Sequence, residues 1–208
     1  MKYTSLFLIF SASILTFYYL KNIHIPTEIL ANTKLRSAVV QNVDEIENYR
    51  QSWVECSSFA VHAAASIIDT NLWSPSEIWS ELWPKFSFWI LPLSLQSYIK
   101  KHLGVYKIQW DIEALTASVA LGYPVILLVE HQWYQHYFTV VWFDLDQDER
   151  YIYDSLVPRV DDVFTEDLND TDPGNYSLSS DELMEKWNNG WRYGLWEMWG
   201  VALAKKSK

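Results

Sequence analysis

The hydrophobic pattern changes near Pro124, and this change constrains the fold more than any other feature of the sequence. Before Pro124, apolar residues recur three and four positions apart, which is helical spacing. After it come runs of strand length that are rich in β-branched and aromatic residues. Helices followed by strands predict an α+β fold, with N-terminal helices packed on a C-terminal antiparallel sheet.

Capping residues, Pro and Gly mark the ends of the expected elements. Ser74-Pro75-Ser76-Glu77 is a typical helix start, and Gly104 and Gly122 end two further helices. The expected helices are 56–68, 74–83, Pro92–Leu103, Ile112–Leu121 and Ser179–Trp187. The expected strands are Pro124–Glu130, His136–Phe143, Arg150–Asp154 and Tyr193–Ala204. The expected loops are the hairpin loop Asp144–Glu149 and the acidic segment Val160–Ser177.

The segment Tyr3–Leu20 is apolar, carries no charge and lies between two lysines. About 18 residues at roughly 1.5 Å each nearly cross the hydrocarbon core of a membrane. We therefore expect residues 1–21 to be a signal anchor; the alternative is a signal peptide, which requires a small-residue cleavage site. Residues 22–43 are then a linker, and residues 44–205 one domain. The expected location is a single-pass membrane protein with an N-terminal anchor, or an exported or cell-envelope protein after cleavage.

Charge and cysteine content exclude several classes of function. The net charge of -10 argues against a nucleic-acid partner, because phosphate backbones require a basic face. Cys56 is the only cysteine, so neither an internal disulfide nor a thiolate-rich zinc site can form. The alternating Asp residues of 144–148 lack the Gly and the closing Glu of a calcium loop, which predicts a solvated loop. No metal or organic cofactor is implied.

Cys56 stands at the start of a predicted helix, where unpaired N–H groups favour a thiolate. Alternatively, Cys56 is a small, buried hydrophobic residue. A nucleophilic thiolate needs a base nearby in space. Among the five histidines, His62 is expected to point outward, whereas His136 begins a strand. Asp154 ends the next strand of the same hairpin, which makes His136 and Asp154 predicted neighbours.

An oxyanion hole requires N–H donors that point at the developing negative charge. The backbone N–H of Cys56 can serve as one donor. Gln51, five residues upstream, is the nearest side-chain amide and the candidate for the second; its alternative role is that of a solvated surface residue. The Trp residues at 187, 191, 196 and 199 are interpreted as core packing or, alternatively, as the lining of a substrate groove.

These motifs together resemble the papain-like cysteine peptidases of the bacteriocin-processing type, which cut leader peptides after a double glycine. The resemblance is closest to free-standing bacterial members without a transporter, and it spans about residues 50–190. The segments that carry it are Gln51, Glu55-Cys56-Ser57-Ser58-Phe59-Ala60, Gly122-Tyr123-Pro124-Val125-Ile126, His136-Tyr137-Phe138-Thr139-Val140-Val141 and Tyr153-Asp154-Ser155-Leu156.

The resemblance implies a papain-like fold, with Cys56 as nucleophile, His136 as general base and Asp154 as the residue that orients it. The expected function is a membrane-anchored or exported thiol hydrolase, a cysteine peptidase with a peptide or protein substrate; transpeptidase and amidase activities need the same triad. Two departures from the family pattern are Ser57 in place of Gly and Gln51 one position closer to the cysteine. The alternative function is an inactive papain-like domain that binds peptides or assists maturation at the membrane.

Overall fold

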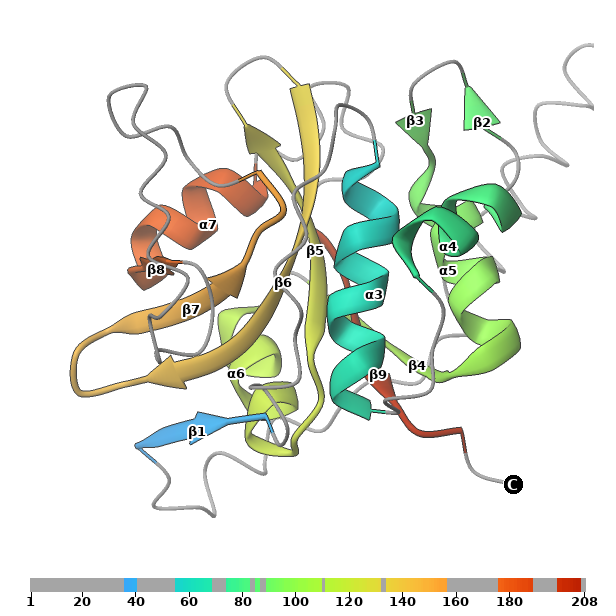
Figure 1. Ribbon diagram of the computed structural model, residues 1–208. Helices are drawn as coiled ribbons and strands as arrows, with labels where there is room; N and C mark the ends of the chain where they lie inside the picture. Colours follow the sequence, from blue (N-terminus) through green and yellow to red (C-terminus); the bar gives the residue numbers. More distant parts are fainter. Residues whose placement is uncertain are drawn as a thin grey trace, which may run out of the picture.

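The computed structural model describes residues 36–40, 55–68, 74–82, 85–86, 89–109, 111–131, 134–156, 176–188 and 198–206. Within these ranges the chain forms five helices and a seven-stranded antiparallel sheet, which confirms the predicted α+β class (Figure 1). The helices are α3 (Cys56–Ile68), α4 (Pro75–Glu81), α5 (Pro92–His102), α6 (Ile112–Ala120) and α7 (Ser180–Asn188). The strands of the sheet are β1 (Ser37–Val39), β4 (Gly104–Gln109), β5 (Val125–His131), β6 (Tyr134–Asp144), β7 (Glu149–Tyr153), β8 (Tyr176–Leu178) and β9 (Trp199–Ala204). A separate hairpin pairs β2 (Lys85–Phe86) with β3 (Trp89–Ile90).

Local capping explains why the helices begin and end where the sequence predicts. The Ser74 hydroxyl accepts a hydrogen bond from the Glu77 backbone N–H, and the Glu77 carboxylate accepts one from the Ser74 N–H at 2.8 Å. The Asp111 carboxylate caps α6 by accepting from the Glu113 N–H at 2.8 Å. Gly122 follows α6 with a φ of 80°, a conformation that glycine adopts without strain.

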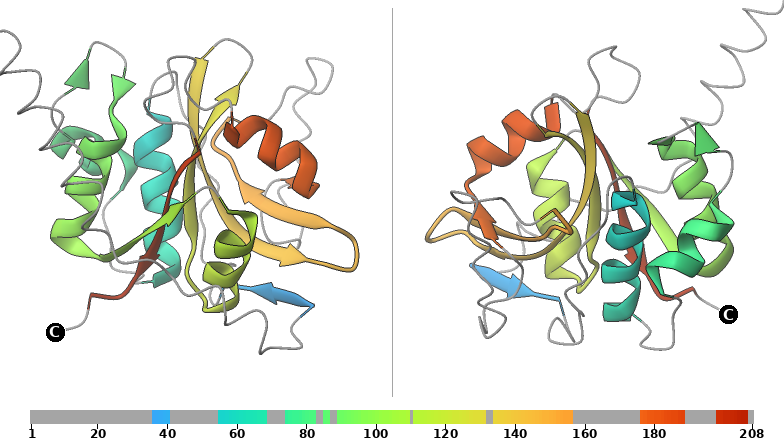
Figure 2. Two further views of the ribbon diagram at one scale, coloured as in Figure 1. Left: turned by 180° about the vertical axis from the view of Figure 1, so that it is seen from behind. Right: turned by 45° about the horizontal axis from the view of Figure 1, so that its top comes forward.

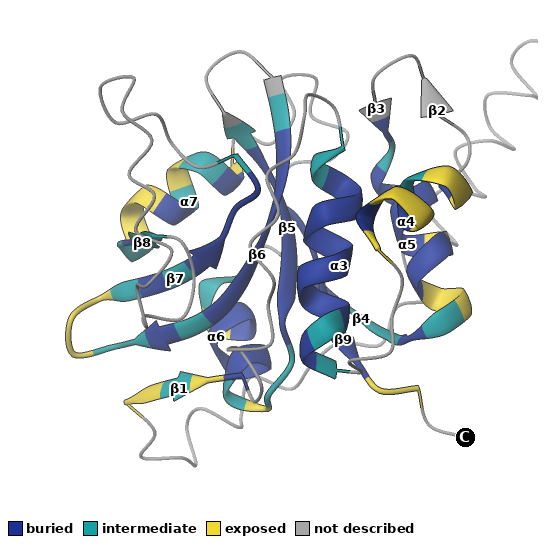
Figure 3. Cartoon of the chain, viewed as in Figure 1, coloured by how far each residue is buried: buried dark blue, intermediate teal, exposed yellow. Residues whose placement is uncertain are grey.

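The sheet separates two hydrophobic clusters, because side chains along a strand alternate between its faces. Its strand order is β4-β9-β5-β6-β7-β8, and β1 pairs with β6. Ile126 and Leu128 of β5 pack in a cluster with residues of α3, α4 and α5, whereas Leu127 and Val129 pack in a cluster with residues of α6 and α7. Figure 2 shows the helices on the two sides of the sheet, and Figure 3 shows that the central strands and α3 are buried.

Three strands of the seven-stranded sheet lie where no strand was predicted. Tyr176 and Ser177 belong to β8, which pairs with β7, so the predicted loop 160–177 is wrong at its end. Ser37–Val39, in the predicted linker, forms β1 and pairs with β6, so the predicted boundary at residue 44 is too late for this strand. β4 was not expected, and it separates α5 from α6 at one edge of the sheet. β1 and β8 are too short to show an alternating pattern. β4 pairs with β9, which is distant in sequence.

Most of the N-terminal region for which predictions were made lies outside the described residues. This region includes the expected anchor or signal segment 1–21 and most of the expected linker. Among the residues that the structure describes, no helix is both long enough and apolar enough to cross a membrane.

Candidate active site

The first candidate residue, Cys56, is the first residue of α3, as the sequence predicts. The carbonyl oxygen of Glu55 accepts hydrogen bonds from the backbone N–H groups of Ser58 and Phe59, at 2.9 and 3.2 Å, and so begins the helix. The N–H of Cys56 precedes these bonds and belongs to the first turn, whose donors have no partner within the helix. The side chain of Cys56 is partly exposed at the positive end of the helix dipole.

The second and third candidates, His136 and Asp154, lie together. The β6–β7 register pairs Thr139 with Tyr153, which brings the start of β6 close to the residue after β7. His136 Nε2 is 2.5 Å from Asp154 Oδ1, and each side chain is 1% exposed. The predicted contact between these two residues is therefore confirmed, and it arises from the antiparallel geometry of the hairpin.

Helix α3 packs along β6, and this packing brings Cys56 to His136. The Thr139 hydroxyl donates a hydrogen bond to the carbonyl oxygen of Ala60 at 2.9 Å and so joins the strand to the helix. The side chain of Cys56 lies close enough to His136 to raise the pKa of the imidazole. Because Nε2 of His136 is engaged by Asp154, the ring nitrogen left to exchange a proton with the thiol is Nδ1.

The electrostatics of this arrangement favour a charged imidazole. Burial alone would lower the pKa of His136. The negative charge of Asp154, the hydrogen bond to it and the adjacent Cys56 outweigh burial and raise the pKa of His136 to about 10. A protonated His136 places a positive charge beside the side chain of Cys56.

Asp154 receives two further hydrogen bonds. The backbone N–H of Leu156 donates to Oδ1 at 2.8 Å, and the hydroxyl of Tyr176 donates to Oδ2 at 3.0 Å. Tyr176 was not among the predicted site residues, because it lies in the segment that was expected to be a loop. No local pattern in the sequence connects Tyr176 to a carboxylate 22 positions away.

The structure describes some of the remaining candidate residues. Gln51, the proposed oxyanion donor, lies outside the described residues. His62 is 9% exposed, so the expectation that it points outward is wrong; the helix that carries it is covered on most sides. Trp187 and Trp199 are buried, which favours core packing for these two members of the Trp group. Trp191 and Trp196 lie outside the described residues.

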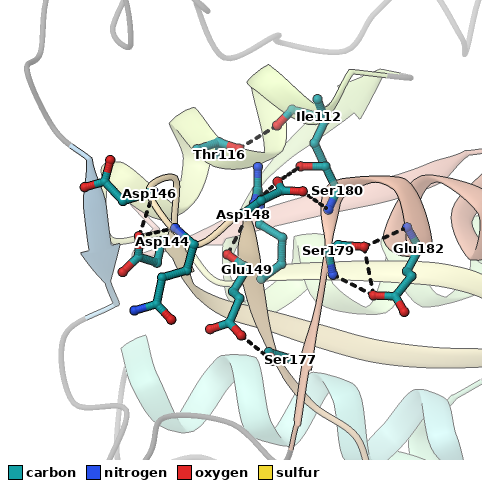
Figure 4. Close-up of polar contacts among 12 residues, drawn as sticks. Ile112, Thr116, Asp144, Asp146, Asp148, Glu149, Ser177, Ser179, Ser180 and Glu182 are labelled. Atoms are coloured by element: carbon teal, nitrogen blue, oxygen red, sulfur yellow. Dashed lines mark hydrogen bonds and ion pairs between the residues drawn. The ribbon is translucent and has the colours of Figure 1, made fainter.

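The acidic hairpin loop forms a turn between β6 and β7, as predicted (Figure 4). Oδ1 of Asp144 accepts hydrogen bonds from the backbone N–H groups of Asp146 and Gln147, at 2.8 and 3.1 Å. The carboxylate of Asp148 accepts one from the hydroxyl of Ser180 at 2.5 Å and so joins the loop to the start of α7. Within the described part of the chain, no group of three or more His, Cys, Asp or Glu residues is arranged to hold a metal ion.

No known protein-family model matches the chain, and no curated protein sequence matches it.

Proposed function

We propose that this protein is a papain-like cysteine hydrolase, a peptidase in which Cys56 is the nucleophile, His136 the general base and acid, and Asp154 the orienting residue. The observation that carries the proposal is the position of His136, whose Nε2 contacts Asp154 and whose imidazole interacts electrostatically with Cys56. This order of contacts is that of a nucleophile, a base and an orienting group. The resemblance of the flanking segments to bacteriocin-processing peptidases supports the same assignment.

The chemistry follows from the charges in the site. The Cys56 thiolate attacks the carbonyl carbon of a peptide bond; a C–S bond forms and the carbonyl electron pair moves to oxygen. The N–H of Cys56, in the first turn of α3, donates to this oxyanion. When the oxyanion collapses, the C–N bond breaks and His136 gives its proton to the leaving amine. Water then attacks the thioester while His136 accepts its proton, and the Cys56 sulfur leaves.

A direct test is labelling with an electrophilic activity-based thiol probe. We expect the native protein to be labelled, Cys56→Ala to be unlabelled, and His136→Ala to be labelled at least about tenfold more slowly, because general-base assistance typically contributes a factor of 10² or more. A matched control is His102→Ala, which removes a histidine from the end of α5. This control is expected to label like the native protein.

Two results would contradict the proposal. Equal labelling of the native protein and His136→Ala would mean a reactive cysteine without a catalytic base. Labelling of the native protein without any turnover of a peptide library would favour the alternative, a papain-like domain that binds peptides. Peptide hydrolysis that is lost in both Cys56→Ala and His136→Ala would establish the enzyme.

A further inference from the structure

The hydroxyl of Tyr176 donates a hydrogen bond to Asp154, and it reaches the carboxylate from a separate strand. Oδ1 of Asp154 already contacts His136 and the Leu156 N–H, whereas Oδ2 accepts from Tyr176 at 3.0 Å. β8 brings Tyr176 to this place by pairing with β7, with Ile152 opposite Tyr176. The edge strand that was not expected from the sequence thus contributes directly to the surroundings of the triad.

The contact of Tyr176 with the second carboxylate oxygen, Oδ2, limits the rotation of the carboxylate. A carboxylate that is held only at one oxygen can turn about its Cβ–Cγ bond, and its terminal torsion is broad in proteins. With Oδ2 held by Tyr176, the plane of the carboxylate is fixed and Oδ1 stays directed at Nε2 of His136. Hydrogen bonds to a charged acceptor are also stronger than bonds between neutral groups, so this contact is effective in a buried site.

Tyr176 remains a donor across the pH range in which His136 operates. Burial, followed by the charge of Asp154 and the hydrogen bond to it, raises the pKa of the Tyr176 hydroxyl above its ordinary value. The hydroxyl therefore stays protonated, and its contact with Asp154 does not depend on pH under these conditions.

We propose that Tyr176 is a positioning residue of the candidate active site: its hydroxyl fixes Asp154, and Asp154 in turn fixes His136 against Cys56. This inference rests on the proposed function. Tyr176 acts through Asp154 and not directly on Cys56.

The test is the pH profile of Cys56 alkylation by iodoacetamide in the full chain. Tyr176→Phe removes only the hydroxyl, and we expect the midpoint of the profile to rise by about 0.5 to 1 pH unit, which is about a threefold to tenfold slower reaction at any pH below the native midpoint. Tyr151→Phe is the matched control, because it removes a tyrosine hydroxyl that donates to the carboxylate of Glu149 on the same strand, β7. The control is expected to keep the native midpoint.

A double-mutant cycle tests whether Tyr176 acts through Asp154. In the Asp154→Ala background, adding Tyr176→Phe is expected to leave the alkylation profile unchanged, because the two residues form one unit. A further shift of the midpoint in this background would overturn the proposed route of action.

A second measurement does not depend on the folding of the Phe variant. With 3-fluorotyrosine incorporated at position 176, the ¹⁹F resonance reports the ionisation of this hydroxyl. We expect its titration to move to lower pH when Asp154 is replaced by Asn, since the carboxylate charge is one cause of the raised pKa. An unchanged titration would mean that the contact does not exist, and the proposal would be wrong.

The results separate the two proposals. Suppose that the native protein has a low alkylation midpoint that depends on His136, while Tyr176→Phe has the same profile as the native protein. Only the proposed role of Tyr176 is then overturned. A native midpoint that is the same in His136→Ala overturns the proposed function as well.

Discussion

Nε2 of His136 lies 2.5 Å from Oδ1 of Asp154, and both side chains are almost fully removed from solvent. Such a pair is costly to bury unless its charges are matched and its remaining polar atoms are satisfied. Asp154 meets this condition through the Leu156 N–H and the Tyr176 hydroxyl. The pair therefore affects both the stability of the folded chain and the reactivity of Cys56.

The raised pKa of His136 predicts a decrease of stability with rising pH. In the folded chain the pKa of His136 is about 10, whereas its ordinary value is 6.5. His136 therefore binds its proton more tightly in the folded chain than in the unfolded chain. The stabilisation is complete below about pH 6.5 and is lost as the pH rises through about 10. We expect the free energy of unfolding in urea to fall by roughly 1–3 kcal/mol between pH 7 and pH 9, since one unit of pKa corresponds to about 1.4 kcal/mol.

Asp154→Asn is the matched variant for this measurement, because it removes the main cause that raises the pKa of His136 while keeping the shape of the side chain. We expect the slope of stability against pH to flatten in Asp154→Asn. Equal slopes in the native protein and in this variant would show that the His136–Asp154 pair does not control the pH dependence.

The buried amine of Lys107 predicts a pH dependence of opposite sign. Lys107 is 6% exposed on β4, and burial, followed by the charge of Lys100, lowers its pKa to about 8. The folded state therefore binds this proton less tightly than the unfolded state, and the cost of the charged amine is greatest at neutral pH. We expect Lys107→Met to stabilise the protein by on the order of 1 kcal/mol at pH 7 and by less at pH 9.5. Lys101→Met, an exposed neighbour, is the control; a larger effect of Lys107→Met at the higher pH would contradict the prediction.

The hydrogen bond between Thr139 and Ala60 predicts a link between the packing of α3 and the reactivity of Cys56. Thr139→Val removes the hydroxyl at nearly constant shape, and we expect a loss of about 1 kcal/mol in the free energy of unfolding. We also expect slower alkylation of Cys56, because this bond holds α3 against β6. Thr116→Val removes a similar bond, to the carbonyl oxygen of Ile112 within α6 at 2.7 Å, and should leave alkylation unchanged. Similar alkylation rates in both variants would rule out a positioning role for Thr139.

The hydroxyl of Ser57 predicts a stabilising substitution beside the nucleophile. Ser57 is 1% exposed, and its Oγ has no hydrogen-bond partner among the described residues. A buried polar group without a partner costs about 1–3 kcal/mol. Ser57→Ala should therefore leave the melting temperature unchanged or raise it, and Ser66→Ala, whose hydroxyl donates to the Ala63 carbonyl, is the comparison. A clear decrease for Ser57→Ala in calorimetry would show that this hydroxyl is bound in solution.

The sequence alone determined the helices and the core of the site, because the responsible signals act over a few residues. Caps, Pro and Gly fixed the ends of α4, α5 and α6, and the helix that begins at Cys56 followed from apolar spacing. The contact of His136 with Asp154 was predictable for the same reason, since a short hairpin loop sets which residues of two strands meet.

Only the tertiary structure decided which distant segments complete the sheet and the site. β1 and β8 have three residues each, too few to show an alternating pattern. β1 also pairs with residues of β6 that lie about 100 positions away along the chain. The burial of His62 depends on elements packed around α3 rather than on its position in the helix. The Tyr176 hydroxyl meets Asp154 because β8 closes against β7, and a contact made by strand pairing across an intervening segment leaves no trace in local sequence.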